Sequence, residues 1–228
     1  MHTSSCVTDI IRGLQESSSC TALWETLLGM PGVGIALIRC DGILLFASNE
    51  FKLHFFGDAQ IHTRGRSLLD LFPREWAKER IEFLGRIESE QERITVREIW
   101  RGRQLLTRVG LLPWREEGRP IACVVTRPAN AGEVEGLEQV VNSSFVELGD
   151  LSVLTPRELA VLALLGEGLT LKQIAERLHR SFKTIDNHRA SIGRKLRESD
   201  RVALSRLALE AGLTLADASL KRVNYSGN

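Results

Sequence analysis

The stretch LTPRELAVLALLGEGLTLKQIAERLHRSFKTIDNHRASIGRKL, residues 154–196, carries the start signals of successive short helices. Thr155, Pro156 and Glu158 stand in the order of an N-cap, a first-turn proline and a capping-box glutamate, so a helix should begin at Pro156. Apolar residues then recur at helical spacing up to Gly166, where a glycine favours a stop. The pattern predicts a short helix with one buried apolar face.

Two further helices follow in the same stretch, with a tight break between them. Thr170 and Gln173 repeat the capping-box pattern, and apolar residues at spacings of three and four predict a helix over residues 170–179. Ser181 is the expected N-cap of the next helix, over residues 182–197. Two helices joined in this way form a helix-turn-helix unit, whose second helix lies in the DNA major groove.

The second helix of this unit has a polar outer face. Ile185, Ile192 and Leu196 fall on one stripe, which we expect to be buried. The residues turned outward are Lys183, Asn187, Ala190, Ser191 and Arg194, with Thr184 and Lys195 on one flank and Asp186 on the other. A solvated helix surface is the alternative interpretation of such a charged face, and the helix-turn-helix pattern favours DNA over it.

The residue types on this face match what DNA offers. Asn187 can make a bidentate contact with adenine, Asp186 can accept from a cytosine amino group, and Ala190 can meet a thymine methyl. Phosphate contacts, which give affinity without sequence information, are expected from Lys183, Arg189, Arg194 and Lys195. Base specificity should therefore come from Asp186, Asn187 and Ala190.

The stretch also resembles the DNA-binding domain of LuxR-type (FixJ/NarL-like) bacterial transcription regulators, over residues 154–213. The shared motifs are L-T-x-R-E, E-G-L-T, K-x-I-A-x-x-L and K-T-hydrophobic-x-x-H. The resemblance implies an all-α domain of four helices that binds double-stranded DNA. It implies that Asp186, Asn187 and Ala190 face the bases. It also implies phosphate contacts by four residues, namely Lys183, Thr184, His188 and Lys195.

Three positions leave alternatives open. His188 could cap or pack on the flank of the helix instead of contacting a phosphate. Arg180 stands where an aliphatic residue is common in the family, and Asp186 stands where lysine is frequent. The local packing of the turn and the identity of the bases read are therefore not fixed by the resemblance.

A fourth helix is expected over residues 200–211, with more apolar residues than one buried stripe needs. The surplus could complete a small core. The family resemblance implies instead that this helix pairs with its counterpart in a dimer, through Val202, Leu204 and Ala208. The tail over residues 214–228 carries no readable motif, and its last residues are expected to be disordered.

Charge and aromatic residues divide the chain of 228 residues into two parts. The net charge is only +1, yet residues 151–228 hold 13 Lys and Arg against 8 Asp and Glu, while residues 1–150 hold 17 against 21. Of the 13 aromatic residues only Phe182 and Tyr225 lie beyond residue 150. This division predicts a separate N-terminal domain over residues 22–127 and a basic domain over residues 151–213.

The N-terminal part has strand patterns. Residues 33–39 and 43–48 are β-like and are joined through Asp41-Gly42, a strong hairpin signal. A helical middle follows, and then come strand candidates over residues 94–100, 104–112 and 121–126. The order predicts an α+β domain with one antiparallel sheet and short helices.

This order resembles a PAS sensor domain, in which an asparagine and a glycine, here Asn49 and Gly57, bracket the first short helix. PAS domains bind haem, flavin or small metabolites, or they dimerise, so the cofactor or ligand stays unknown. The cysteine of flavin-adduct sensors is missing from the middle of the domain, and the histidines available to a haem are His54 and His62. We expect an unidentified small-molecule ligand or a protein contact.

Other functional classes are poorly supported. The chain lacks the phosphate-loop, nucleophile-elbow and metalloprotease motifs, so we predict that it is not an enzyme and has no catalytic residues. The four cysteines show no zinc spacing, so no metal site is expected. The phosphoacceptor pattern of a receiver domain is also missing. A protein-interaction module, in which the helix-turn-helix binds another regulator, is the alternative to DNA-binding transcription regulation.

The linker over residues 128–150 is expected to be partly helical, because residues 134–145 carry an apolar stripe. It could form a short coiled coil or serve as a spacer. We expect a homodimer that contacts DNA and, as a transcription regulator, RNA polymerase. The N-terminus lacks a signal-peptide pattern and no long apolar run occurs, so a cytoplasmic protein without a membrane contact is predicted.

Overall fold

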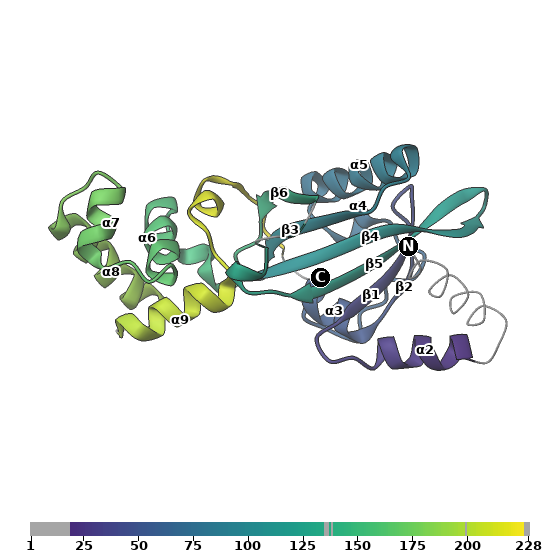
Figure 1. The fold of residues 1–228 in the computed structure, drawn as a ribbon, viewed down its shortest axis with the longest axis horizontal. Helices are drawn as coiled ribbons and strands as arrows, with labels where there is room; N and C mark the ends of the chain where they lie inside the picture. Colours follow the sequence, from purple (N-terminus) through teal and green to yellow (C-terminus); the bar gives the residue numbers. More distant parts are fainter. Residues whose placement is uncertain (1–18, 135–136, 138, 199, 226–228) are drawn as a thin grey trace, which may run out of the picture.

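The computed structural model describes residues 19–134, 137, 139–198 and 200–225. Its N-terminal part is built on a seven-stranded sheet in the order β2-β1-β5-β4-β3-β6-β7 (Figure 1). The strands are β1 (Gly34–Arg39), β2 (Leu44–Ala47), β3 (Ile94–Trp100), β4 (Arg103–Glu116), β5 (Arg119–Pro128), β6 (Val140–Val146) and β7 (Lys221–Arg222). The first five strands of this order, β2, β1, β5, β4 and β3, pair antiparallel with their neighbours. Strand β6 pairs in parallel with β3, and β7 pairs in parallel with β6.

The sequence prediction of an α+β domain with a hairpin at Asp41-Gly42 is confirmed. Strands β1 and β2 form that hairpin, and Gly42 has a φ of +92°, which glycine adopts without strain. Asn49 and Gly57 bracket the first helix after the hairpin, as predicted, with Gly57 in the left-handed C-cap conformation. Helices α2 (Ser19–Leu28), α3 (Asn49–Phe56), α4 (Leu68–Leu71) and α5 (Arg74–Glu90) complete this part.

One face of the sheet packs against α3, α4 and α5. Side chains alternate along each strand, so Val96 and Trp100 of β3 point to the helices and join a buried cluster with Phe51, Phe55 and Trp76. The residues between them point to the opposite face. This N-terminal core is rich in aromatic rings, as the uneven distribution of Phe and Trp along the chain predicts.

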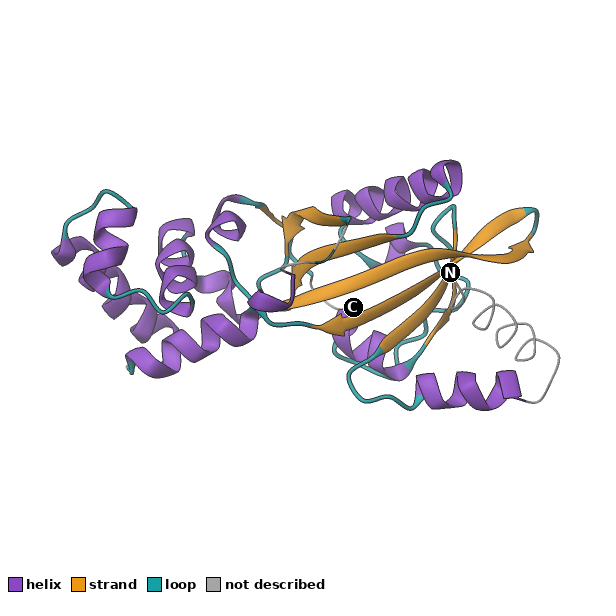
Figure 2. Cartoon of the chain, in the orientation of Figure 1, coloured by secondary structure: helices purple, strands orange, loops and turns teal. Residues whose placement is uncertain are grey.

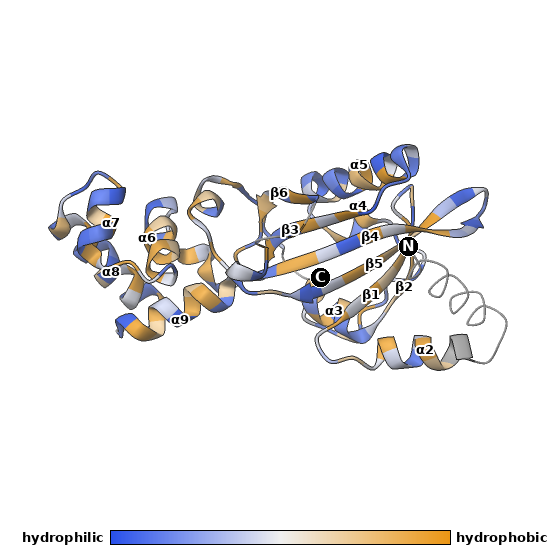
Figure 3. Cartoon of the chain, in the orientation of Figure 1, coloured by the Kyte–Doolittle hydropathy of each residue, from blue (hydrophilic) through white to orange (hydrophobic). Residues whose placement is uncertain are grey.

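The C-terminal part is helical and lies beyond one end of the sheet (Figure 2). Its helices are α6 (Pro156–Gly166), α7 (Leu171–Arg177), α8 (Phe182–Leu196) and α9 (Arg201–Ala211). The capping boxes predicted at Thr155 and Thr170 are both present. Helix α6 is largely hydrophobic and α7 largely hydrophilic (Figure 3), which fits a central α6 around which the other helices pack.

The predicted linker helix is wrong. Residues 131–134 form a 3-10 turn, η1 (Ala131–Val134), and residues 140–146 form β6 in parallel with β3. Glu79 of α5 also holds this strand, since its carboxylate accepts from Ser144 N at 2.7 Å and from Ser143 Oγ at 2.8 Å. The apolar spacing is compatible with a helix, but the open edge of β3 offers the backbone a sheet partner instead.

The C-terminal tail, in which the sequence shows no motif, contains regular structure over residues 215–222. Residues 215–219 form a 3-10 helix, η3 (Leu215–Ser219), and β7 then pairs with β6. The tail returns to the N-terminal sheet, where Val223 and Tyr225 join the N-terminal core cluster. Its last residues, 226–228, lie outside the described part of the chain.

Among the described residues, no helix is both long and apolar enough to cross a membrane. The same residues hold no group of three or more His, Cys, Asp or Glu side chains placed to bind a metal ion.

Candidate nucleic-acid interface

Helix α8 is positioned by local signals that the sequence contains. Ser181 caps its N-terminus, with Ser181 Oγ accepting from Thr184 N at 3.1 Å. Ile185 and Ile192, two members of the predicted inward stripe, are 1% and 0% exposed, and Leu196 packs against the same core. The orientation of α8 predicted from its apolar stripe is therefore the orientation in the fold.

The exposed residues of α8 form one line on its outer side. Lys183, Asn187, Ala190 and Arg194 are all exposed, and their spacings of four, three and four residues keep them on one helix face. Thr184 and His188 are half-buried beside this line. The face therefore presents two cations, an amide and a methyl group to the outside.

Asp186 forms an ion pair with Arg189 one turn later, with 3.4 Å between Asp186 Oδ1 and Arg189 Nε. Both side chains are about one-third exposed. The ion pair places the Arg189 cation beside Asp186, which is the single carboxylate on the described outer face of α8. This neighbour reduces the repulsion between Asp186 and a DNA phosphate.

Lys195 lies in a different environment from the other cations of α8. Its ammonium contacts Glu158 Oε2 at 2.6 Å, and Ser191 Oγ donates to Glu158 Oε1 at 2.6 Å. Glu158 also closes the capping box of α6 by accepting from Thr155 N at 2.7 Å. Glu158 thus joins the N-terminus of α6 to the last turns of α8.

Burial raises the pKa of Glu158, but hydrogen bonds from Lys195, Ser191 and Thr155 outweigh it and lower the pKa from 4.5 to about 2. The carboxylate is therefore charged at neutral pH and holds the Lys195 ammonium. This contact joins residues 37 positions apart, and the capping-box motif alone gives no sign of it.

Two basic residues that sequence reasoning did not place at the interface lie near α8. Arg157 and Arg180 line a hollow of about 390 Å³ together with His188 and residues of α6 and η3. His188 therefore packs at the rim of a basic hollow, so both its predicted phosphate contact and a packing role remain compatible with its place.

The predicted dimerisation residues on α9 require a correction. Leu204 and Ala208 are 0% and 1% exposed, and Ala208 packs so closely on α6 that a Cβ at Gly166 would lie 2.8 Å from it. They complete the domain core, so the prediction that they contact a partner is wrong. Val202 is 73% exposed and Leu209 is 49% exposed, so these two side chains form the apolar surface of α9.

The N-terminal domain contains a small internal cavity of about 40 Å³. Its lining is mostly aromatic and aliphatic, and it includes Glu98 of β3. Glu98 Oε2 accepts from Trp76 Nε1 and from Arg80, both at 2.8 Å, whereas Glu98 Oε1 is buried and has no hydrogen-bond partner among the described residues. Glu98 therefore offers a further acceptor, Oε1, on a side chain that lines the cavity.

The two histidines considered as haem ligands do not line this cavity. His54 Nε2 lies 2.9 Å from the carbonyl oxygen of Gly32, and His62 is exposed.

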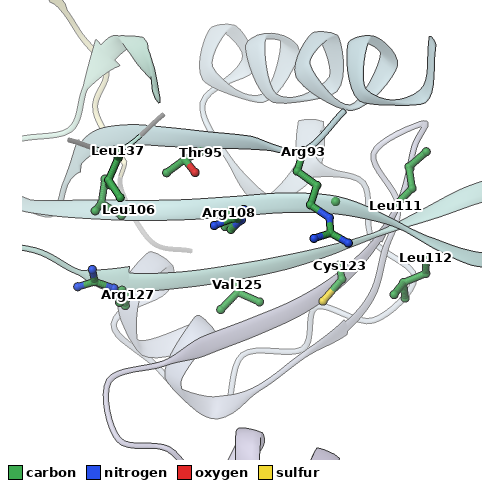
Figure 4. A pocket seen from close by; sticks show the side chains of 11 residues that line it. Arg93, Thr95, Leu106, Arg108, Leu111, Leu112, Cys123, Val125, Arg127 and Leu137 are labelled. Carbon is green, nitrogen blue, oxygen red and sulfur yellow. The ribbon is translucent and has the colours of Figure 1, made fainter. Parts of the chain in front are cut away.

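The opposite face of the sheet, away from α3, α4 and α5, holds an open hollow of about 480 Å³. Figure 4 shows Arg93, Arg108 and Arg127 on this face, on or next to the strands β3, β4 and β5. Thr95, Leu106 and Val125 lie between these arginines. The face is therefore both apolar and basic.

Comparison with known proteins identifies the C-terminal part. Residues 152–208 match the family described as bacterial regulatory proteins, luxR family. The response regulator RamR of Streptomyces coelicolor is 43% identical over 61 residues, which cover 27% of this chain and 30% of that protein. The chain therefore matches less than a third of the length of this curated relative.

Several solved structures are similar over longer stretches at low identity. The VqmA dimer of Vibrio cholerae, a LuxR-type receptor, is 18% identical, with 90% of this chain and 94% of that chain covered and a TM-score of 0.41. A phage VqmA in complex with DPO is 19% identical, with 83% and 87% covered and a TM-score of 0.44. The PAS domain of an HTR-like protein from Haloarcula marismortui is 19% identical, with 54% and 99% covered and a TM-score of 0.35.

The family match spans α6, α7, α8 and most of α9, and the hairpin, the helices and strands β3, β4 and β5 before them follow the order of a PAS domain. Residues 152–208, in the C-terminal helix-turn-helix domain, match the luxR family of bacterial regulatory proteins, and the chain joins this domain to an N-terminal domain with the element order of a PAS domain.

Proposed function

We propose that the chain is a sequence-specific DNA-binding transcription regulator, with α8 as the helix that enters the major groove. The observation that carries the proposal is the exposed line of Lys183, Asn187, Ala190 and Arg194 on a helix held by buried Ile185 and Ile192. A rigid helix with such a face fits the groove and offers groups that base edges and phosphates bind. Such a regulator works in the bacterial cytoplasm, where its DNA is.

The roles on α8 divide into base reading and phosphate binding. In this proposal Asn187 bridges adenine, Ala190 meets a thymine methyl, and Asp186 accepts from cytosine while Arg189 compensates its charge. Lys183 and Arg194, at the two ends of the exposed line, are placed to contact phosphates with help from Thr184 and His188. Lys195 contributes less positive charge to DNA than Lys183, because Glu158 pairs with it.

A homodimer is part of the proposal. Val202 and Leu209 give α9 an exposed apolar surface, and two copies joined there would carry two α8 helices. The DNA site should then be a pseudo-palindrome with half-sites about one helical turn apart. RNA polymerase is a further partner in this proposal.

Selection of binding sequences from random DNA by the full chain tests this function. We expect enrichment of one pseudo-palindromic sequence and a mobility shift on it that scrambled DNA of the same length does not give. A protein-interaction module would leave the pool without an enriched sequence. That result would reject DNA recognition and favour the alternative, in which α8 binds another regulator.

The internal cavity supports ligand sensing by the N-terminal domain. Because Glu98 Oε1 is a buried acceptor with no donor in the described part of the chain, the ligand class that fits is a small molecule with an amine or hydroxyl group. The cavity of about 40 Å³ has room for only a few ligand atoms. To regulate DNA binding, such a ligand must bind the DNA-competent and incompetent states with different affinity.

Thermal unfolding in a panel of short-chain amines and alcohols tests this ligand class. At least one compound should raise the melting temperature of the wild type but not of Glu98→Gln, since the glutamine amide would place its NH₂ group where the free acceptor stands. Glu92→Gln, at an exposed carboxylate beyond the cavity, is the matched control and should behave as the wild type. Equal shifts in wild type and Glu98→Gln, or no shift with any compound, would contradict the assignment.

A further inference from the structure

The segment of residues 213–225, called the C-terminal strap below, leaves the DNA-binding domain and returns to the sensor sheet. After α9 the chain forms η3, and β7 then pairs with β6, with Phe145 opposite Lys221 and Val146 opposite Arg222. Val223 N donates to Val146 O at 2.9 Å. The path from α9 back to the sheet is visible in Figure 1 as the yellow segment. The two domains are therefore joined twice, once by residues 147–154 and once by the strap.

A buried ion pair forms the first anchor of the strap. Arg97 of β3 donates to both carboxylate oxygens of Asp217, each at 2.8 Å, and also to the carbonyl oxygen of Gly212 at 2.9 Å. The side chains of Arg97 and Asp217 are 7% and 1% exposed. Bidentate geometry of this kind fixes orientation as well as distance. The end of α9 and the start of the strap are thus held on the sensor sheet.

A ring contact forms the second anchor. Tyr225 packs among aromatic rings of the sensor core, with ring centroids 5.7 Å from Trp100, 6.0 Å from Phe56 and 6.1 Å from Phe72. Val223, two residues earlier, is 7% exposed in the same core. The end of the strap therefore packs against the sensor core, with Val223 buried and Tyr225 half-buried.

Each anchor is next to a residue that lines the internal cavity, in the chain or in space. Glu98, which lines the cavity, is the direct neighbour of Arg97 on β3, and the two side chains point to opposite faces of the sheet. Phe72 lines the cavity and also contacts Tyr225. A movement of Glu98 would therefore act on the strap through its neighbour Arg97, and a movement of Phe72 would act on it through Tyr225.

We infer that Asp217 and Tyr225 are positioning residues for DNA recognition, because the anchored strap fixes the DNA-binding domain on the sensor domain and so sets the affinity for a two-half-site operator. The inference rests on the proposed function. A single half-site needs only one α8, whereas two half-sites require both domains of a dimer at one spacing and orientation. Releasing the strap should lower the effective concentration of the second domain at its half-site.

Titrations of full-length protein on operator DNA and on a single half-site test the inference. Tyr225→Ala and Asp217→Asn should each weaken binding to the two-half-site operator on the order of tenfold and leave single-half-site binding unchanged. Lys221→Ala is the matched control within the strap, because it removes an exposed ion pair with Glu75 and neither anchor. It should bind both DNAs as the wild type does.

Three other results of these titrations would overturn the inference, and a fourth would reject the proposed function. Unchanged operator affinity in both anchor variants would overturn the inference, and so would an equal loss on operator and half-site, which would show damage to the DNA-binding domain itself. A wild type that prefers the operator no more than the half-site would overturn it too. A wild type that binds neither DNA specifically would reject the proposed function, which distinguishes the two failures.

Discussion

Replacing Asp217 by alanine should lower the free energy of unfolding by about 3–5 kcal/mol, because Arg97 would stay buried without its counter-charge. The side chain of Asp217 is 1% exposed, so water cannot replace it without opening the contact between the strap and the sheet. Asp217 also accepts from Thr214 N at 2.8 Å, and this bond would be lost as well. Urea unfolding of the two proteins measures the difference.

The control for this prediction is an arginine–carboxylate ion pair at the surface. Arg206 and Glu210 lie 3.7 Å apart on α9 with side chains 73% and 65% exposed, so Glu210→Ala should change stability by less than about 0.5 kcal/mol. Replacing both Arg97 and Asp217 by leucine should cost less than Asp217→Ala, since no buried charge is then left unpaired. Equal losses for Asp217→Ala and Glu210→Ala would show that the buried pair does not hold the strap.

Acid should remove the stabilising effect of Glu158. Its folded-state pKa of about 2 lies below the ordinary value of 4.5, so the carboxylate stabilises the fold fully above about pH 4.5 and loses this effect as the pH falls through about 2. The shift corresponds to at most about 3 kcal/mol. Unfolding of wild type and Glu158→Gln between pH 7 and pH 2 should show a stability difference that shrinks toward the acid end.

Glu167→Gln, at an exposed carboxylate just after α6, is the matched control and should leave the stability within about 0.5 kcal/mol of the wild type at pH 7. A stability difference between wild type and Glu158→Gln that stayed constant down to pH 2 would contradict the roles of Lys195 and Ser191 as donors to a charged Glu158.

Local signals predicted much of the fold. The capping boxes at Thr155 and Thr170, the N-cap at Ser181 and the hairpin at Asp41-Gly42 each involve residues within a few positions of one another, and each is found where the sequence places it. The outer face of α8 follows from one apolar stripe. Features of this kind can be derived from the sequence because the chain does not need its distant parts to form them.

The errors all concern contacts between distant parts of the chain. Residues 140–146 are a strand because β3 has an open edge, which the helical spacing of their own side chains does not reveal. Leu204 and Ala208 are buried because α9 packs on Gly166 of α6. The apolar pattern of α9 does not distinguish these core residues from exposed residues that could contact a partner. Tyr225 reaches a core built from residues more than 120 positions earlier.

The most direct test of the central claim, that α8 reads bases with Asn187 and binds phosphate with Lys183, is a salt-dependent titration on selected and scrambled DNA. Asn187→Ala should weaken binding to the selected sequence by about 1–3 kcal/mol and leave scrambled DNA unaffected. Lys183→Ala should weaken both and reduce the salt slope by about one unit, more than Lys195→Ala does, since Glu158 already pairs with Lys195. An equal loss on both DNAs for Asn187→Ala, or a loss confined to the selected sequence for Lys183→Ala, would contradict this orientation of α8 in the groove.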